Sequence, residues 1–250
     1  MNPIYYENLT LEKQGETLTV VACDKEASEV EIPASLWDIP IVAIGDRAFE
    51  DCQRLTRVVL PEADCEAGIG YDAFDTIGEY AFSGCISLSE IVIPDSVSVV
   101  WRGAFYGCEG LKRAVFSQNT YFAPYTFGKC SALIDISPLK TVSEGMFYDC
   151  RSLEAVTLLD GCDSIDEDAF EHCEALRAVY IPSSVQRVEA LAFRSCYALQ
   201  SVTFENPDGW YSSNRYNDRV ISIDISDPIN NARALGGMDF DDGIIAWFRK

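Results

Sequence analysis

The sequence has little positive charge and a single histidine, His172. Nineteen Lys and Arg side chains stand against forty Asp and Glu, which gives a formal charge of −21 at pH 7. Such a surface repels nucleic acids and anionic membranes, so we expect no nucleic-acid partner. Because catalytic triads and His-ligated metal sites have only one candidate histidine, we also expect no enzymatic activity, no metal and no cofactor.

Long apolar runs are also missing. No stretch approaches the roughly 20 residues that span a bilayer, so we expect no membrane insertion. The N-terminal segment MNPIYYENLTLEKQ lacks a basic region followed by an apolar one, and so is not typical of a signal peptide. Two localisations stay open: the cytoplasm, if Met1 is the native start, or the outside of the cell, if an export signal has been removed.

The chain is rich in copies of one phrase. IGDRAFEDCQRLTRVVLP begins at Ile44, IGEYAFSGCISLSEIVIP begins at Ile77, and five similar segments follow. The phrase has a Phe, a Cys three residues later and a Leu three residues after the Cys. The seven Phe residues are Phe49, Phe82, Phe105, Phe127, Phe147, Phe170 and Phe193, at intervals of 33, 23, 22, 20, 23 and 23 residues. A period of about 20–29 residues with Leu at a fixed offset is typical of a leucine-rich-repeat solenoid.

The spacing within one copy predicts the shape of one coil. From the Leu onward, apolar and polar residues alternate, as in LSEIVI, which predicts a strand with one buried face. The AFxxC part has apolar residues three apart, which suits a turn of α- or 3₁₀-helix. A short second extended piece, such as VSVV, should complete the coil. We therefore predict an α/β fold: a right-handed solenoid of about seven coils of 20–23 residues, with a parallel sheet on one face.

Both ends of the chain have the character of caps. Residues 1–43 predict a β-hairpin around Gly15 and a partial first coil, residues 44–204 hold the repeats, and residues 205–250 form a C-terminal cap. In the last of these, Asp227 suits an N-cap, Pro228 the first helical position and Gly236 the helix end. The 33-residue interval carries an insert near 62–76, which we interpret as an aborted repeat.

The pattern IGxxAFxxCxxLxxVxIPxxV resembles the BspA-type leucine-rich repeat, over Val30 to Phe204. This repeat occurs in surface proteins of gut and oral bacteria, treponemes and trichomonads. The resemblance implies a solenoid without catalytic activity that binds a protein or peptide, and adhesion is the role attributed to some members.

Seven cysteines occupy one column of the repeat: Cys52, Cys85, Cys108, Cys130, Cys150, Cys173 and Cys196. They lie 20 or more residues apart and form no CxxC pair, so the spacing does not favour zinc. Laddered side chains point in parallel, which disfavours the torsion angle of a disulfide. We predict that these thiols are reduced, buried and packed as small apolar groups. A reactive thiol would be sought at Cys23, Cys65 or Cys162.

Other chemical candidates are weaker. The sequence DFDDG at Asp239–Gly243 lacks the spacing of a calcium-binding loop. The acidic run Asp166–Asp168 could form a carboxylate site, although such clusters are common in a chain of this charge. A carbohydrate-active or carbohydrate-binding solenoid and an intracellular scaffold therefore stay open as alternatives.

The exposed side of the predicted strands remains as a binding surface. Its outward positions carry valines beside charged residues in the first coils, a composition that suits a protein or peptide partner. The equally open alternative is ordinary β-propensity on a solvated sheet. The candidate partner-binding residues are Arg57, Val59, Glu90, Val92, Arg113, Val115, Asp135 and Tyr180.

Overall fold

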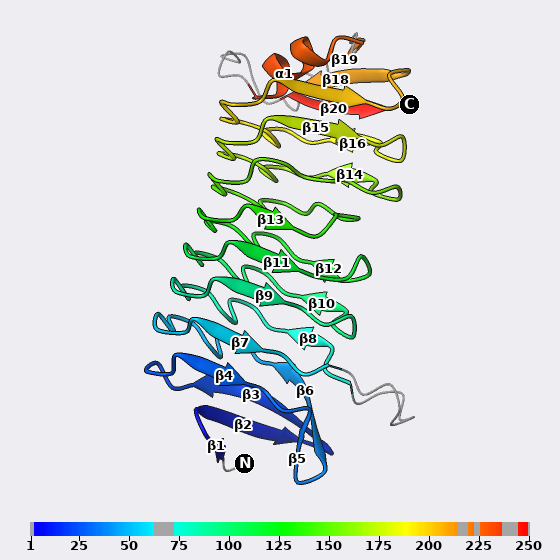
Figure 1. Ribbon diagram of the computed structural model, residues 1–250. Helices are drawn as coiled ribbons and strands as arrows, with labels where there is room; N and C mark the ends of the chain where they lie inside the picture. The colour runs from blue at the N-terminus through cyan, green and yellow to red at the C-terminus, as the bar shows by residue number, and fades with distance from the viewer. Residues whose placement is uncertain (1–2, 63–72, 215–219, 223–225, 237–244, 250) are drawn as a thin grey trace. The chain divides into compact units, whose positions relative to one another are not determined.

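The computed structural model describes residues 3–62, 73–214, 220–222, 226–236 and 245–249. The chain divides into two compact units, Met1–Ser137 and Pro138–Lys250. Each unit is a stack of short-stranded coils of the kind that the repeat period predicts (Figure 1). The predicted solenoid is therefore confirmed, whereas the division into cap, repeats and cap stays a prediction.

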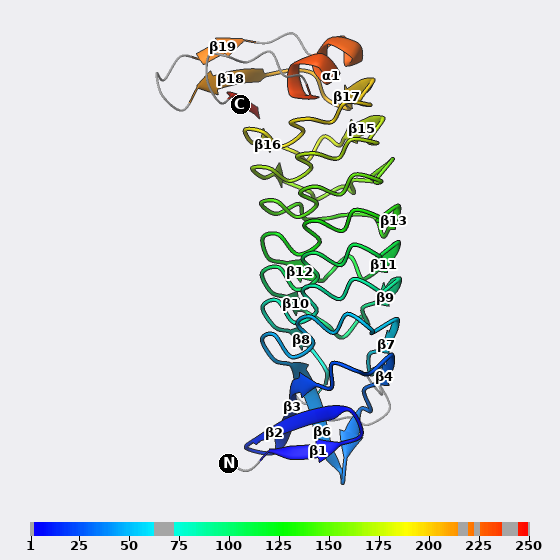
Figure 2. The ribbon, with the colours of Figure 1, turned by 90° about the vertical axis from the view of Figure 1, so that its left-hand side faces the viewer.

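Two sides of the coils in the first unit form sheets. One sheet has the order β1-β2-β3-β6-β8-β10-β12, and β5 pairs with β6 at its side. On the other side β4 pairs with β7, while β9, β11 and β13 form a separate sheet. Figures 1 and 2 show these two columns of strands. The strands are β1 (Ile4–Tyr6), β2 (Leu9–Gln14), β3 (Thr17–Cys23), β4 (Glu29–Glu31), β5 (Ser35–Leu36), β6 (Ile39–Ile44), β7 (Arg57–Val59), β8 (Thr76–Ile77), β9 (Glu90–Val92), β10 (Val99–Val100), β11 (Arg113–Val115), β12 (Tyr121–Phe122) and β13 (Asp135–Ile136).

The N-terminal hairpin is confirmed. Strands β2 and β3 pair antiparallel, and Gly15 takes a φ of 62° in the turn between them. Strand β3 then pairs in parallel with β6, so the hairpin continues the sheet to which β8, β10 and β12 belong. The partial first coil is also confirmed, because β4 pairs in parallel with β7.

The second unit is also built from short strands. The order of its larger sheet is β14-β16-β20-β18-β19, and β15 pairs in parallel with β17. Three isolated parallel bridges, among them Val142 with Ile165, join further coils. The elements are β14 (Ser164–Ile165), β15 (Ala178–Ile181), β16 (Arg187–Val188), β17 (Ser201–Phe204), β18 (Trp210–Asn214), β19 (Val220–Ser222), α1 (Pro228–Gly236) and β20 (Ile245–Arg249).

The predicted C-terminal helix is confirmed as α1. Asp227 caps it, since its Oδ1 accepts hydrogen bonds from the backbone N–H groups of Ile229 and Asn230 at 2.9 and 3.3 Å. Strand β20 pairs antiparallel with β16, and the buried Trp247 of β20 stacks on Phe204 with centroids 5.8 Å apart. This apolar cover closes the last coil of the second unit, as the sequence predicts.

The core of each unit is a column of phenylalanine rings. All seven repeat Phe side chains are fully buried. In the first unit the rings of Phe82 and Phe105 stack with centroids 5.2 Å apart and an interplanar angle of 2°. In the second, Phe147 stacks on Phe170 and Phe170 on Phe193, at 5.5 and 5.2 Å. One ring per coil therefore gives every coil the same internal contact with its neighbours.

The AFxxC segments differ from the predicted helical turn. Residues two before and two after each repeat Phe have φ between 52° and 73°, which no α- or 3₁₀-helix accommodates. In the first coil, the N–H groups of Ala48, Glu50 and Cys52 bond to carbonyls three residues back, within the coil. Those of Arg47, Phe49 and Asp51 instead donate to the next coil, at Glu79, Ala81 and Ser83. The segment is thus a succession of tight turns. Along it, every second N–H group donates within its own coil and the N–H groups between them donate to the next coil.

The cysteine column is buried and free of disulfides in the described residues. Each thiol for which a bond is resolved donates to the carbonyl of the Phe one coil earlier, such as Cys108 Sγ to Phe82 O at 3.1 Å. The same bond joins Cys85, Cys130, Cys173 and Cys196 to Phe49, Phe105, Phe147 and Phe170. Burial raises the pKa of the Cys108 thiol well above its usual value and that of Cys196 to about 12. The predicted burial of these thiols is confirmed, and their reduced state in the native protein stays a prediction.

Several sequence interpretations fall outside the described residues. The aborted repeat is one, since most of Ile69–Phe74 is not described, and only Ala73 and Phe74 of its pattern are placed, the first exposed and the second buried. Cys65 and Asp239–Gly243 are the others. The remaining off-ladder thiols, Cys23 and Cys162, are buried.

Candidate partner-binding face

The outward side chains of β4, β7, β9, β11 and β13 form one face of the first unit, which we call the strand face. Period-two alternation buries Val58, Ile91 and Ala114 and turns their neighbours in sequence outward. Parallel register then aligns Glu90 with Arg113, and Val92 with Val115. Val92 is 51% exposed, whereas Val59 and Val115 are half-buried. Seven of the eight predicted residues thus lie on this face.

A row of ion pairs crosses the strand face. The Arg113 guanidinium donates to Glu90 Oε1 at 2.7 Å and to Asp135 Oδ2 at 2.9 Å, so one cation joins three neighbouring strands. The two carboxylates raise the pKa of Arg113 further above its usual value. Because all three side chains are largely exposed, solvent screens these pairs and they contribute little to stability. The pairs fix the positions of these groups rather than stabilise the fold.

Arg57 differs from Arg113 in its surroundings. It lies one coil before Glu90 and, within the described residues, makes no ion pair. Glu29 is its register partner on β4, and the exposed Glu31 aligns with Val59. Arg57 is therefore the cation of the strand face that is available to a partner, whereas Arg113 is held by its own chain.

A depression of about 400 Å³ opens in the strand face beside Arg57. Its walls come from β7 and β9 and the residues that follow them: Thr56, Arg57, Val58, Val59, Leu60, Glu62, Ser89, Glu90, Val92 and Pro94. Strands β7 and β9 belong to different sheets, so the ladder of the strand face is interrupted where the depression lies. Four of the predicted residues, Arg57, Val59, Glu90 and Val92, line it.

Tyr180 is the eighth predicted residue and lies on β15 in the second unit. It is 50% exposed, and partial desolvation together with the charge of Glu205 raises the pKa of its hydroxyl. Its neighbours on β15 and β17 are small side chains, including Ala178, Ser201 and Thr203. Tyr180 therefore belongs to a sheet of the second unit, whereas the other seven predicted residues belong to the first unit.

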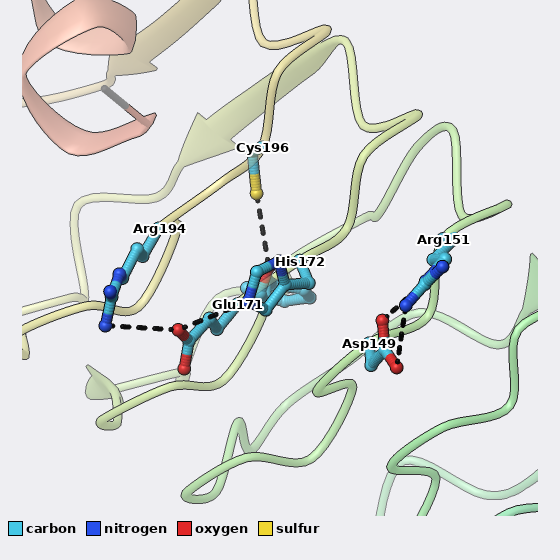
Figure 3. A network of polar contacts seen from close by, with 7 residues as sticks. Asp149, Arg151, Glu171, His172, Arg194 and Cys196 are labelled. Atoms are coloured by element: carbon cyan, nitrogen blue, oxygen red, sulfur yellow. Dashed lines mark hydrogen bonds and ion pairs between the residues drawn. The ribbon is translucent and has the colours of Figure 1, made fainter. Parts of the chain in front are cut away.

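His172, the single histidine, lies in a polar network of the second unit (Figure 3). Its Nε2 is 3.7 Å from Glu171 Oε1, and Arg194 Nη1 is 3.5 Å from the same oxygen. The imidazole is half-buried and packs edge-on against the ring of Tyr148 at 6.0 Å. The side chain of His172 therefore lies against the surface of its own coil rather than extending freely into solvent.

A carboxylate pair lies next to this network. Asp168 Oδ1 is buried without a hydrogen-bond partner, and the Asp168 carboxyl lies beside that of Glu171, which is itself buried. Desolvation and the charge of Glu171 raise the pKa of Asp168 to about 7. Asp168 therefore takes up a proton near neutral pH, and the protonated form can donate to Glu171.

Within the described part of the chain, no group of three or more His, Cys, Asp or Glu side chains is arranged to hold a metal ion. The same residues include no helix with the length and apolar character needed to cross a membrane.

Sequence reasoning missed the depression and the residues that complete it. Thr56, Glu62, Ser89 and Pro94 line it, yet none belongs to an outward column of the predicted strands. The sequence feature that could have indicated the depression is the 33-residue interval between Phe49 and Phe82. Its ten extra residues follow Pro61, just after β7. The Asp168–Glu171 pair was also missed, because only the turn geometry brings two carboxyl groups three residues apart together.

Two solved structures are similar to this chain, and the first of them supports the architecture. The crystal structure of the leucine-rich repeat protein of T. pallidum is 22% identical, with a TM-score of 0.66 over 79% of this chain and 91% of that one. A leucine-rich repeat protein from Bacteroides ovatus is 19% identical over 80% of this chain and 88% of that one, with a TM-score of 0.44. No curated protein matches the chain.

The repeat itself matches a described family. Six copies of the BspA type leucine rich repeat region cover residues 23–75, 71–143 and 140–232, which together are most of the sequence. The copies include the strands of the strand face and the Phe and Cys columns behind it. The chain therefore belongs to the BspA-type leucine-rich-repeat family.

Proposed function

We propose that this protein is a non-catalytic binding module that holds a protein or peptide on the strand face of its first unit. The observation that supports this most is Val92, a half-exposed apolar side chain at the rim of the depression. An apolar centre with a charged border is the composition of a protein-binding surface. Family membership supports a binding module, and adhesion at a cell surface is the role that we favour.

The charges of the strand face favour a basic partner. Glu29, Glu31, Glu62 and Glu90 lie on or beside β4, β7 and β9, and Arg57 is the cation among them. The formal charge of −21 also attracts basic partners at long range, before contact is made. Association should therefore be faster for basic ligands and should slow as salt is added, since charges beyond about 8 Å are screened at physiological ionic strength.

A displayed library of random twelve-residue peptides, selected on the intact chain, tests the proposal. The selected peptides are then measured against Val92→Asp and against Ile86→Asp. Both residues belong to the same coil and are similarly exposed, at 51% and 43%, but Ile86 lies in the turn segment away from the strand face. We expect Val92→Asp to weaken binding at least about tenfold, as for a central interface residue, and Ile86→Asp to leave it within about twofold.

The selection also shows how the proposal would fail. Peptides that bind the wild-type chain and Val92→Asp equally, or that lose binding only with Ile86→Asp, would place the binding surface elsewhere. Selected sequences that are predominantly acidic would contradict the charge argument while leaving the strand face as the binding surface.

A further inference from the structure

The first two full coils are those of Phe49 and Phe82. In the described residues they are hydrogen-bonded to each other in the turn segments and between β6 and β8, but not on the strand face. In the turn segments, Arg47, Phe49 and Asp51 donate their N–H groups to the next coil, and Ile44 of β6 pairs with Ile77 of β8. On the strand face, no backbone hydrogen bond within the described residues joins β7 to β9. The two coils therefore meet at one strand spacing on two sides, whereas on the third side, where the depression lies, β7 and β9 are neighbours that no hydrogen-bonded ladder of the described residues joins.

This opening leaves backbone polar groups without a ladder partner. In a parallel ladder, alternate residues turn their N–H and C=O groups to opposite sides. Val59 accepts a hydrogen bond from Ile32 on the β4 side, so the polar groups of Val58 point toward β9. Ile93 donates to Val115 on the β11 side, so those of Val92 point toward β7. Such groups favour a partner when water is excluded from them.

The walls of the opening combine these carbonyls with apolar and acidic side chains. Val59, Val92 and Pro94 offer aliphatic surface, while Glu62 and Glu90 add carboxylates at the rim. Arg113 lies on β11, the strand on the other side of β9, and donates a hydrogen bond to Glu90 Oε1 from there. A side chain with an aliphatic stem, a positive charge and several donors in one plane matches this set of groups.

We propose that the opening between β7 and β9 receives an arginine side chain of the bound partner. The stem lies between Val59 and Val92, and the guanidinium donates to the carbonyls of Val58 and Val92 and to the carboxylates of Glu62 and Glu90. This inference rests on the proposed function and specifies which chemistry the partner must present. Arginine provides five donors in a fixed fork, and it is also enriched among residues that dominate interface energies.

Other occupants fit the opening less well. An extended backbone inserted as a new strand needs two strand spacings, about 9.6 Å, and the bonds of the turn segments and of β6 with β8 hold the coils closer than that. Lysine presents a compact point charge with three donors, and lacks the planar fork that can bond a carboxylate and a carbonyl side by side. A carboxylate would be attracted by Arg57 but repelled by Glu62 and Glu90.

Nuclear magnetic resonance titration of the full chain with acetyl-Val-Arg-Val-amide tests the proposal. We expect saturable shifts of the amide signals of Val58, Glu90 and Val92. The peptide with Lys in place of Arg should bind at least about fivefold more weakly, and the neutral isostere citrulline at least about tenfold more weakly. In the protein, Glu62→Gln should weaken the Arg peptide severalfold, and the control Glu109→Gln, an exposed carboxylate in the turn segment of the next coil, should not.

Three outcomes would overturn the inference: equal binding of the Arg and citrulline peptides, stronger binding of a Glu peptide, or no saturable shift at β7 and β9. Failure here is distinguishable from failure of the proposed function. If library peptides lose binding to Val92→Asp but tolerate exchange of every arginine for lysine, the strand face still binds, and the arginine site does not exist.

Discussion

Replacing Phe170 by Ala removes the middle ring of the stack Phe147–Phe170–Phe193 in the second unit. The ring is fully buried, and its centroid lies 5.5 and 5.2 Å from its two neighbours. Truncating a buried Phe costs about 3–5 kcal/mol, since a cavity remains. Stacked pairs add roughly 0.5–1.5 kcal/mol each beyond burial, so two lost stacks place this site in the upper part of the range. We expect the free energy of unfolding to fall by about 4–5 kcal/mol.

His172→Ala is the matched control. It changes a ring in the same turn segment, two positions away, but a half-buried one whose Nε2 lies 3.7 Å from Glu171 Oε1. Loss of such a contact should alter the free energy of unfolding by at most about 1 kcal/mol.

Urea unfolding followed by far-ultraviolet circular dichroism at pH 7 compares the two variants with the wild-type chain. Comparable losses at Phe170 and His172 would refute the assignment of the buried and outward faces of the turn. A loss below about 2 kcal/mol at Phe170 would show that the ring column is not the main internal contact.

Three further predictions concern the turns, the thiols and the buried acid pair. Gly107→Ala should lower the free energy of unfolding by about 1–2 kcal/mol through conformation alone, because Gly107 has a φ of 73° and an added Cβ would meet no atom closer than 3.9 Å; an unchanged melting temperature would contradict the tight-turn geometry. In Cys65→Ser, the nine described thiols should react slowly with iodoacetamide in the folded chain and rapidly in urea, since they are buried; one rapidly labelled ladder cysteine in the native state would refute this. The pKa of Asp168 is about 7 in the folded chain and 3.8 in the unfolded chain, so its protonation stabilises the fold fully below about pH 4, and this contribution is lost as the pH rises through 7. Between pH 4 and 8 the wild-type chain should therefore lose more stability than Asp168→Asn, by on the order of 1 kcal/mol after allowance for partial exposure, and parallel urea midpoints would argue against the Asp168–Glu171 pair.

The core could be predicted from the sequence because its chemistry is periodic. Each coil must bury one edge, so the Phe, Cys and Leu columns mark the inside wherever they recur. The same logic identified the N-terminal hairpin around Gly15 and the helix after Asp227, where turn and capping residues have strong local preferences.

The turn segments could not be predicted in the same way. Apolar residues three apart fit a helical turn and a chain of tight turns equally well, and the difference lies in the sign of φ. Gly84 and Gly107 stand at positions of positive φ, yet Asp51 and His172 occupy the equivalent positions in other coils. Hydrogen bonds between coils, such as Phe49 to Ala81, stabilise this backbone, and they exist only once the coils are stacked.

The candidate site was predictable in its residues but not in its shape. Alternation identified Val59 and Val92 as outward side chains of neighbouring coils. It could not show that Arg113 is held by Glu90 and Asp135, because that depends on side-chain reach across the register. Nor could it show that ten extra residues after β7 coincide with an interrupted ladder, since an insert of the same length can also leave a sheet intact.

Hydrogen exchange of the full chain, with and without a library-selected peptide, tests the location of binding most directly. Amides at residues 56–60 and 89–93, in the two segments that border the depression, should exchange more slowly in the complex. The turn segments of the same coils should be unchanged. Protection confined to the turn segments, or to the second unit with the strand face unaffected, would contradict a partner-binding role for the strand face.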